Sequence, residues 1–437
     1  MKHPLVSKLK RQWHGAMRVA FSVLPRSIRF ALYRWMVDCE PHPDERLVLK
    51  IADTKEELEA CFRLLHDAYV GAGYMKPDPS GMRATIYHAL PTTTTLCAKF
   101  DGKVVGTLSL IRESTFGFPL QSAFDLHDIR ARGGRIAEAS ALAVHPDFRK
   151  TSGSIMFPLM KFMYDYCQDY FDTSNLVIAV NPDRIEMYES LLCFERLEQA
   201  QVDNYDFANG APAVGACLNM RTSYASFKKF YGNRTRRKNL HIFFNRSRLK
   251  NIIVPSRRYF TTNDPVMTPE LLDYFFNQCT GTLKKLGPHQ LGLLHAIYNN
   301  ADYAGVLPPL GDARDEKTGL RQHLRYSLNC PAEFLYPDQG NTANVRLRVV
   351  ELSETGFFAY AKQALPERIW GEAIVQLGNN EKSAVRAMVT RSKHKGEGGM
   401  YGFKLVEPDL AWRKFVGALQ SGITHDDLAH ATRFLGD

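Results

Sequence analysis

The chain has 437 residues, of which 45% are hydrophobic and 23% charged, and its formal net charge is +10. This length predicts two or three globular domains. The eight cysteines are scattered, with no C-x-x-C pair and no histidine cluster at ligand spacing, which argues against a disulfide scaffold or a zinc site and fits a reducing cytoplasm.

Residues 1–45 are both basic and apolar, and they predict amphipathic helices. The segment lacks the clean apolar core and the small-residue cleavage site of a signal peptide. Helices of this kind lie on membrane surfaces or dock on their own domain, and both interpretations stay open here. The expected location is the cytoplasm, with peripheral contact to the inner membrane as the alternative that the segment raises.

Residues 46–222 alternate strand and helix signals and predict an α/β domain. A strand over residues 48–53 precedes a helical period over residues 55–69. Asp101-Gly102 separates two β-rich runs, and this dipeptide is a strong signal for a hairpin because type I′ turns need positive φ. A strand-like run at residues 135–144 then leads through a loop into a helix that begins at Met156.

The runs "IAEASALAVHPDFRKTSGSIMF" and "LVIAVNPDRIEMYESLLCFERL" carry a resemblance to known enzymes. Residues 48–220 resemble the GNAT N-acyltransferase fold, and within it the N-acyl amino acid synthases and the acyl-homoserine-lactone synthases. The resemblance implies a mixed sheet flanked by helices. It also implies an enzyme that moves a long-chain fatty acyl group, usually from acyl carrier protein, to the amine of an amino acid or a similar small molecule.

The family match assigns the catalytic candidates. Glu138 stands at the family's acidic position and is expected to act as a base or to orient the amine; without the match, a strand-end carboxylate in a salt bridge would be the simpler interpretation. Tyr188 is close to the position of a tyrosine acid for the departing thiolate, although a core role for a helical aromatic residue is the stronger alternative. Asn181 is expected to cap a helix.

Two departures from the family pattern refine the expected reaction. Ala141 replaces an arginine of the lactone synthases, which favours plain amide formation. The loop expected to hold the donor phosphate has its glycine displaced, and Ile155 occupies a small-residue position. A phosphopantetheine arm has one phosphate at this point, so acyl carrier protein is the easier donor to reconcile, with coenzyme A as the alternative. The loop residues are Arg149, Lys150, Ser152, Gly153 and Ser154.

Residues 223–315 predict a basic, mainly helical connector. From Ala225 to Arg258 there are eleven lysines and arginines and no acidic residue. Such a surface attracts acidic partners, and acyl carrier protein is one of them. Aromatic residues interleave the basic run, but no nucleic acid is expected as a partner. Thr268 and Pro269 predict a helix start.

Residues 316–420 predict a small β-barrel from six short strand-like runs. The order Arg-x-x-x-Arg followed by Glu-Leu-Ser-Glu-Thr-Gly resembles the PilZ domain, whose members bind cyclic di-GMP through Arg-x-x-x-Arg and (Asp/Asn)-x-Ser-x-x-Gly. The resemblance implies a regulatory ligand site made by Arg321, Arg325, Glu351, Ser353 and Gly356. A tail helix is expected over residues 421–437.

The departure in the second motif is Glu351, which stands where the family has aspartate or asparagine. Its carboxylate can still accept from guanine, one methylene further out, and loss of the ligand is the alternative. The sequence therefore predicts an N-acyltransferase regulated by cyclic di-GMP. A catalytically degenerate cyclic di-GMP receptor and a coenzyme A-dependent N-acyltransferase remain as alternatives, and no metal is expected.

Overall fold

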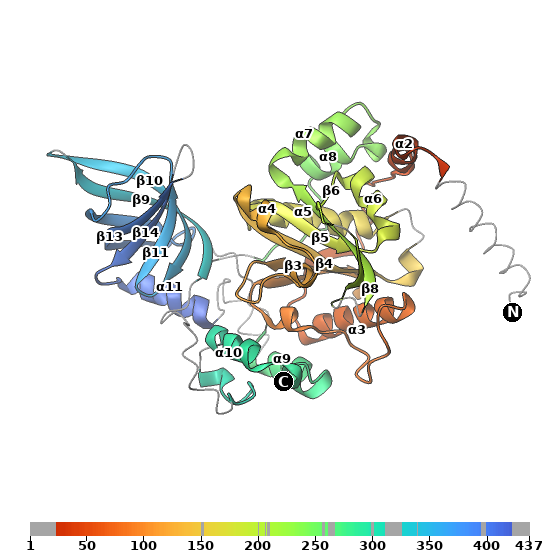
Figure 1. Cartoon of the computed structure of the whole chain (residues 1–437), viewed down its shortest axis with the longest axis horizontal. Helices are drawn as coiled ribbons and strands as arrows, with labels where there is room; N and C mark the ends of the chain where they lie inside the picture. The colour runs from red at the N-terminus through yellow and green to blue at the C-terminus, as the bar shows by residue number, and fades with distance from the viewer. Residues whose placement is uncertain are drawn as a thin grey trace, which may run out of the picture.

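Two bodies make up the protein, an eight-stranded mixed sheet flanked by helices and a closed six-stranded barrel (Figure 1). The structure is a computed structural model that describes residues 23–149, 153–199, 201–205, 207, 210–255, 258–260, 267–298, 301–310, 326–338, 340–394 and 399–421. The first body confirms the predicted α/β fold, and the second confirms the predicted barrel.

The strands of the first body follow the order β1-β2-β3-β4-β5-β8-β6, and β7 pairs with β8 outside this path. The pair β4–β5 is parallel, and the other pairs are antiparallel. The strand bounds are β1 Leu47–Ile51, β2 Thr93–Phe100, β3 Lys103–Arg112, β4 Arg135–Val144, β5 Thr173–Val180, β6 Glu195–Arg196, β7 Val202–Tyr205 and β8 Ala211–Asn219.

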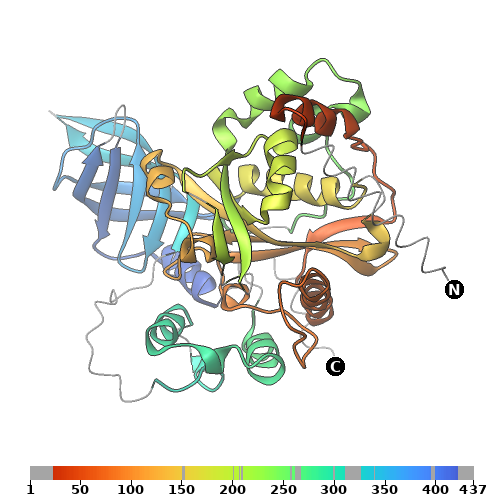
Figure 2. The ribbon, with the colours of Figure 1, turned by 45° about the vertical axis from the view of Figure 1, so that its right-hand side comes forward.

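Helices cover both faces of this sheet (Figure 2). One face packs against α5 (Met156–Asp169), α7 (Met220–Tyr231) and α8 (Leu240–Asn245), and the other against α3 (Lys55–Gly71) and the helices of the connector. The connector contains α9 (Pro269–Leu272), a π-helical turn over Asp273–Cys279 and α10 (Pro288–Ile297). Shorter helices are η1 Ile86–Ala89, η2 Pro119–Ser122, α4 His127–Ala131 and η3 Pro146–Phe148.

Local sequence signals account for several of these boundaries. Asp101 and Gly102 have φ of 49° and 77°, so the predicted hairpin turn is confirmed between β2 and β3. The side chain of Asn181 accepts from the N–H of Asp183 at 2.9 Å and caps α6 (Pro182–Leu192). Thr268 caps α9 in the same way, by accepting from the N–H of Leu271.

The strands β4 and β5 part in the middle of the sheet. They are paired from Arg135 to Glu138, and beyond Glu138 the strand β5 continues only with β8. One extra residue of β4 lies opposite β3 at the same point, where Ala141 has a φ of 54°. This β-bulge bends β4 away from β5, since a bulge kinks its strand and increases the local twist.

The barrel closes in the order β10-β11-β14-β13-β12-β9. Its strands are β9 Tyr326–Asp338, β10 Asn341–Ser353, β11 Gly356–Ala361, β12 Trp370–Gln376, β13 Lys382–His394 and β14 Gly399–Leu405. The helix α11 (Leu410–Ser421) packs its buried Trp412 and Phe415 against the barrel core. The predicted tail helix at residues 421–437 falls almost entirely outside the described residues.

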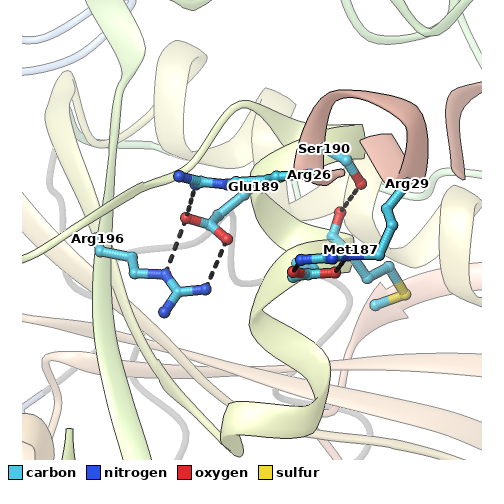
Figure 3. Close-up of polar contacts among 7 residues, drawn as sticks. Arg26, Arg29, Met187, Glu189, Ser190 and Arg196 are labelled. Atoms are coloured by element: carbon cyan, nitrogen blue, oxygen red, sulfur yellow. Dashed lines mark hydrogen bonds and ion pairs between the residues drawn. The ribbon is translucent and has the colours of Figure 1, made fainter. Parts of the chain in front are cut away.

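The N-terminal helix α2 (Arg26–Met36) docks on α6 of the sheet domain (Figure 3). Arg26 pairs with the buried Glu189 at 2.6 Å, and Arg29 pairs with Glu186. Arg196 donates to both oxygens of Glu189, at 2.9 and 3.0 Å, so that one buried carboxylate holds two arginines. Residues 26–36 of the basic segment therefore dock on their own domain, which is one of the two predicted alternatives.

In the described part of the chain, no helix has the length and apolar character to cross a membrane.

Candidate functional site

Glu138 lies where β4 and β5 part, and only 1% of its surface is exposed. In register it faces Ile111 of β3 on one side and Val177 of β5 on the other. Its carboxylate accepts a hydrogen bond from the N–H of Leu120 at 3.0 Å. Burial raises the pKa of Glu138 to about 8, against an opposing effect of that hydrogen bond. A carboxyl group with this pKa can take and return a proton near neutral pH.

An apolar cluster surrounds the carboxylate and comprises Ile111, Phe118, Leu120, Phe124, Leu126, Ile129, Ile136, Val177, Tyr205, Ala213 and Cys217. We call these residues the Glu138 cluster. They come from β3, β4, β5, β7, β8 and the segment between β3 and β4. Glu138 makes no ion pair with any of the described residues, so the salt bridge that would be expected without the family match is not seen there. The buried carboxyl in an apolar setting is an arrangement common at catalytic sites.

The negative charge of Glu138 contributes to raised pKa values of two tyrosines, Tyr87 and Tyr205. Burial, and then the charge of Glu138, raises the pKa of Tyr87 to about 12. The same two causes raise the pKa of Tyr205, which is 3% exposed. The hydroxyl of Tyr205 is buried and has no hydrogen-bond partner in the described part of the chain. Both tyrosines therefore stay protonated at neutral pH.

Tyr188 is half-buried on α6, and its ring packs edge-on against Phe194 at 6.0 Å. Burial raises its pKa to about 12. The packing of Tyr188 is thus that of a partly buried core residue. Its role as an acid stays a prediction.

His88 is a buried histidine that the sequence patterns did not predict. His88 is 4% exposed, and its Nε2 is 3.2 Å from the hydroxyl oxygen of Ser109 on β3. Its Nδ1 is 3.0 Å from the hydroxyl oxygen of Thr85. Burial and then the charge of Arg83 lower the pKa of His88 to about 3, so the ring is neutral in the working pH range. No sequence pattern signals this residue, because its partner Ser109 lies on β3, 21 residues along the chain.

The loop expected to hold the donor phosphate connects β4 to α5. Arg149 donates from Nε to the carbonyl oxygen of Val144 at 2.8 Å, so its side chain closes the end of β4. Gly153 has a φ of +83°, and a Cβ there would lie 2.6 Å from the ring of Phe157. Ser154 follows at the start of the helix, whereas Lys150 and Ser152 lie outside the described residues.

Ile155, the departure at the small-residue position, turns into the core. It is 2% exposed, and its side chain occupies the space over Gly106 of β3, where a Cβ would lie 2.8 Å from it. The bulky residue therefore fills a gap between α5 and the sheet.

The barrel has its own cavity of about 390 Å³ at the turn between β10 and β11. It is lined by Glu351, Leu352, Ser353, Thr355, Gly356, Phe357, Phe358, Thr390, Gly402, Phe403 and Lys404. The hydroxyl of Ser353 donates to the carbonyl oxygen of Gly356 at 3.2 Å and closes the turn. A Cβ on Gly356 would lie 2.4 Å from the carbonyl oxygen of Phe403, so the close approach of two strands requires glycine there.

Three of the five residues of the second-messenger motif are thus brought together. Arg321 and Arg325 lie outside the described residues, and the structure gives no account of them. The residue after Arg325 is Tyr326, which starts β9 and pairs with Leu352. The strand that begins immediately after the two arginines therefore starts beside the motif of Glu351 and Ser353. Lys404, exposed on β14, adds a cation to the cavity.

The two sites are joined through β4. Arg135, the first residue of this strand, reaches into the barrel and donates from Nη2 to the carbonyl oxygens of Leu328 and Val350. Arg348 of β10 also pairs with Asp172, just before β5, at 3.1 Å. The N–H of Phe260, in the connector, also donates to the carbonyl oxygen of Leu377 in the barrel, at 2.8 Å. No group of three or more His, Cys, Asp or Glu able to hold a metal occurs within the described ranges.

Comparison with known proteins gives a family match for the sheet domain. Residues 60–219 match the family model described as N-acyl amino acid synthase FeeM. The matched stretch runs from α3 to the end of β8 and contains Glu138, the donor loop and Tyr188. The match supports an enzyme of the N-acyltransferase class. A comparison with curated protein sequences gave no match.

Several solved structures are similar to part of the chain. FeeM, an N-acyl amino acid synthase from uncultured soil microbes, is 22% identical, with 41% of this chain and 94% of that one covered at a TM-score of 0.36. A CoA-dependent acyl-homoserine lactone synthase, BjaI, is 19% identical, covering 48% and 93% at 0.34. An acyl-CoA N-acyltransferase from Pseudomonas aeruginosa is 14% identical, covering 39% and 97% at 0.27.

Proposed function

We propose that the protein transfers a long-chain fatty acyl group from a thioester to the amine of an amino acid or a similar small amine. The observation that carries the proposal is Glu138, a buried carboxyl with a raised pKa at the point where β4 and β5 part. The family match over residues 60–219 supports the same reaction class. Both observations concern one segment of the chain.

The reaction follows from the groups at this point. The acceptor nitrogen attacks the thioester carbonyl carbon, the C–N bond forms and the C–S bond breaks. Glu138 takes the proton that the amine loses, and the thiolate takes up a proton and leaves as a thiol, for which Tyr188 is the proposed source. The Glu138 cluster excludes water, which strengthens the electrostatic effects on the carboxyl group and protects the thioester from hydrolysis.

Acyl carrier protein is the proposed donor, with acyl coenzyme A as the alternative. The donor loop leads into α5, and α8 packs on α5 through contacts such as the Phe157–Phe243 ring pair at 6.3 Å. The exposed lysines Lys228 and Lys229 of α7 and the basic stretch before α8 lie on the same side of the sheet. An acidic carrier protein would be steered to this surface, and its arm would then reach the donor loop.

Cyclic di-GMP is the proposed regulatory ligand of the barrel. The cavity of about 390 Å³ combines acceptors on Glu351 and Ser353 with aromatic walls from Phe357, Phe358 and Phe403. Carboxylate oxygens suit the guanine edge, aromatic faces suit its rings, and the cation of Lys404 suits a phosphate. Arg321 and Arg325, which precede β9 in the chain, would complete the binding site for this ligand.

Peripheral membrane contact is proposed for the N-terminal segment. Although α2 docks on α6, its outer side keeps Trp35 65% exposed and Ile28 46% exposed. Lys238 lies 5.0 Å from the Trp35 ring, so apolar and basic groups share this surface, as they do in helices that lie on anionic membranes. Sedimentation with anionic and with neutral vesicles tests this part of the proposal.

The acyl-transfer proposal is tested with the purified full-length protein. Long-chain acyl carrier protein and the corresponding acyl coenzyme A are offered with a mixture of amino acids, and amide formation is followed by mass spectrometry. We expect amide product with the wild type and its loss in Glu138→Gln. Unchanged product formation in the variant would remove Glu138 from the reaction. No product with either donor would favour the alternative of a catalytically degenerate receptor, which calorimetry with cyclic di-GMP and Arg325→Ala would then test.

A further inference from the structure

The helix α2 turns its apolar side toward solvent, which is the reverse of the usual arrangement. Ile28, Trp35 and Met36 on the helix and Val23 just before it are all exposed, by 46% to 79%. Ile28 and Trp35 are seven residues apart and therefore lie on one side of the helix. The helix of a globular protein normally packs such a side against the core, whereas no residue of α2 is buried. The apolar side of α2 thus faces away from the sheet domain.

The basic side of α2 is the side that holds the helix in place (Figure 3). Arg29 donates from Nε to a carboxylate oxygen of Glu186 on α6, at 2.9 Å. Arg34 donates from Nε to the carbonyl oxygen of Ser190, also at 2.9 Å, and its guanidinium carbon lies 3.7 Å from the centre of the Phe230 ring on α7. Because the arginines are tied to partners on α6 and α7, the fold itself sets the outward direction of the apolar side.

A basic turn from a distant part of the chain lies beside this apolar side. The turn is η5 (Arg236–Lys238), which follows α7. Lys238 donates from Nζ to the carbonyl oxygen of Trp35 at 2.7 Å and lies 5.0 Å from the centre of its ring. Arg237 pairs with Asp38 at 2.9 Å, and Arg236 is exposed. Apolar and cationic groups from two segments far apart in the chain thus form one surface, which we call the α2–η5 surface.

An anionic lipid bilayer fits this combination of groups. Tryptophan and aliphatic side chains enter the boundary between head groups and acyl chains, while lysine and arginine beside them attract lipid phosphates. Arg26, at the other end of α2, has an exposed side chain and adds a cation there. A second copy of the chain would bring the same cations to the contact, because the usual two-fold interface pairs a surface patch with itself. Like charges would then oppose the association.

We infer that the α2–η5 surface binds a bilayer that contains anionic phospholipid. The inference rests on the proposed peripheral membrane contact and deepens it, because it names the side chains that enter the bilayer. It also assigns Arg236 and Lys238 to lipid phosphates and leaves Lys228 and Lys229 to the carrier protein. In Figure 1, α2 and the barrel lie at opposite ends of the molecule, so a protein bound through α2 would hold its barrel away from the bilayer.

The test measures sedimentation of the full-length protein with vesicles of phosphatidylcholine alone and with vesicles that also contain phosphatidylglycerol. We expect the wild type to bind the anionic vesicles about tenfold more tightly or better, since each surface cation is attracted by anionic lipid. Trp35→Ser should weaken this binding about tenfold, because a large apolar side chain no longer enters the boundary region. Arg236→Gln combined with Lys238→Gln should weaken it by a similar factor.

The neutral vesicles show whether the double variant acts through charge. Its binding to phosphatidylcholine alone should stay within about twofold of wild type, because no lipid charge is lost there. Val406→Ser, at an exposed apolar residue of the barrel, is the matched control for Trp35→Ser. Lys362→Gln combined with Lys382→Gln, at two exposed lysines of the barrel, is the matched control for the double variant. Both controls should bind both kinds of vesicle as the wild type does.

A second measurement reports the position of Trp35 directly. Lipids brominated in their acyl chains quench the fluorescence of a tryptophan that enters the bilayer. The wild type should be quenched on anionic vesicles, and Trp35→Phe, which keeps an apolar ring, should bind as well but lose most of this quenching. Equal quenching of the two proteins would place Trp35 outside the bilayer and overturn the inference.

The outcomes separate this inference from the proposals on which it rests. If the wild type binds no vesicle, the proposed membrane contact fails together with the inference, while amide formation without vesicles tests acyl transfer independently. If the Trp35 variant and the double variant bind as the wild type does, the membrane contact stands and this surface is rejected. Equal affinity of the wild type for both kinds of vesicle would reject the anionic lipid.

Two further results would assign the surface to a protein instead. A dimer that is seen by ultracentrifugation and lost in Trp35→Ser would assign it to a second copy of the chain. A raised KM for acyl carrier protein in the double variant, with unchanged vesicle binding, would assign it to the carrier protein.

Discussion

Arg135 and Val350 meet across the contact between the sheet domain and the barrel, with Nη2 of the arginine 3.4 Å from the carbonyl oxygen of the valine. Each residue has a special place in its own strand. Arg135 begins β4, three residues before Glu138, and Val350 lies at the β-bulge of β10, directly before Glu351. The same nitrogen donates to the carbonyl oxygen of Leu328, and burial lowers the pKa of Arg135, which is half-buried, as is Val350. One side chain thus connects the strand that carries Glu138 to the edge of the barrel cavity.

This connection predicts the effect of Arg135→Gln. Cyclic di-GMP should still bind the barrel, because Arg135 does not line its cavity. Its effect on acyl transfer, of whichever sign, should fall to within about twofold of no effect, since β4 has lost its contact with the bulge. Calorimetry gives the binding, and amide formation with and without the ligand gives the effect.

Arg348→Gln is the matched control for Arg135. Arg348 also crosses the domain contact, but its pair with Asp172 has both side chains 48% exposed, and such surface pairs contribute about 0–1 kcal/mol. This variant should keep the ligand effect. A full ligand effect in Arg135→Gln would show that the signal travels by another route.

The raised pKa of Glu138 predicts a pH dependence of catalysis. A base must be ionised, and burial raises the pKa of this carboxyl to about 8, so kcat/KM should rise with pH below about 8 and level off above it. Glu138→Gln should lower kcat by about a hundredfold or more and remove this limb. Glu113→Gln, an exposed glutamate at the end of β3 paired with Arg130, should leave the profile unchanged.

The same carboxyl predicts a pH dependence of stability. The pKa of Glu138 is higher in the folded state, about 8, than in the unfolded chain, so the folded state binds the extra proton between the two values. Its contribution to the free energy of unfolding is complete below the unfolded pKa and is lost as pH rises toward 8. Glu138→Gln should therefore gain stability over wild type above pH 8, by an order of a few kcal/mol at about 1.4 kcal/mol per pKa unit. Urea unfolding at pH 5 and pH 9 measures the difference, and an equal effect at both pH values would contradict the assignment.

Gly356 predicts the effect of a single methyl group on the barrel. A Cβ at this position would lie 2.4 Å from the carbonyl oxygen of Phe403, so Gly356→Ala should force β11 and β14 apart and cost about 1–3 kcal/mol. Because Gly356 lines the cavity, the ligand should also bind more weakly. Gly417→Ala on α11 is the matched control, since its Cβ meets no atom within 4 Å, and alanine should be neutral or slightly stabilising in a helix. Thermal unfolding compares the two variants.

Local signals were enough to predict much of the fold. The hairpin at Asp101-Gly102, the helix caps at Asn181 and Thr268 and the six strands of the barrel depend on residues that are near one another in the chain. Periodicity and turn chemistry report such features directly. Glu138 was predicted from a motif; it lies buried on β4 where β4 and β5 part, and its catalytic role stays a prediction.

Features built from distant segments could not be predicted. Arg83 and Phe207 meet because the segment between α3 and η1 lies against the segment between β7 and β8, and no spacing in the sequence encodes this contact. Arg135 had no distinguishing pattern either, since its partners are carbonyl oxygens of the barrel. Ile155 was interpreted from its position in the loop motif, whereas the structure turns its side chain into the core over Gly106.

The basic surface beside α5 predicts a salt dependence that distinguishes the two donors. Attraction between exposed charges is screened over about 8 Å at 0.15 M salt, so KM for acyl carrier protein should rise steeply with ionic strength. Acyl coenzyme A, which presents no protein surface, should show a weaker rise. Lys228→Glu combined with Lys229→Glu on α7 should raise KM for the carrier protein about tenfold or more at low salt, because opposite potentials at an interface govern encounter, and leave KM for acyl coenzyme A nearly unchanged. Lys362→Glu, at an exposed lysine that follows β11 in the barrel, is the control for added negative charge. Equal effects of the two charge reversals on both donors would place the carrier protein elsewhere on the molecule.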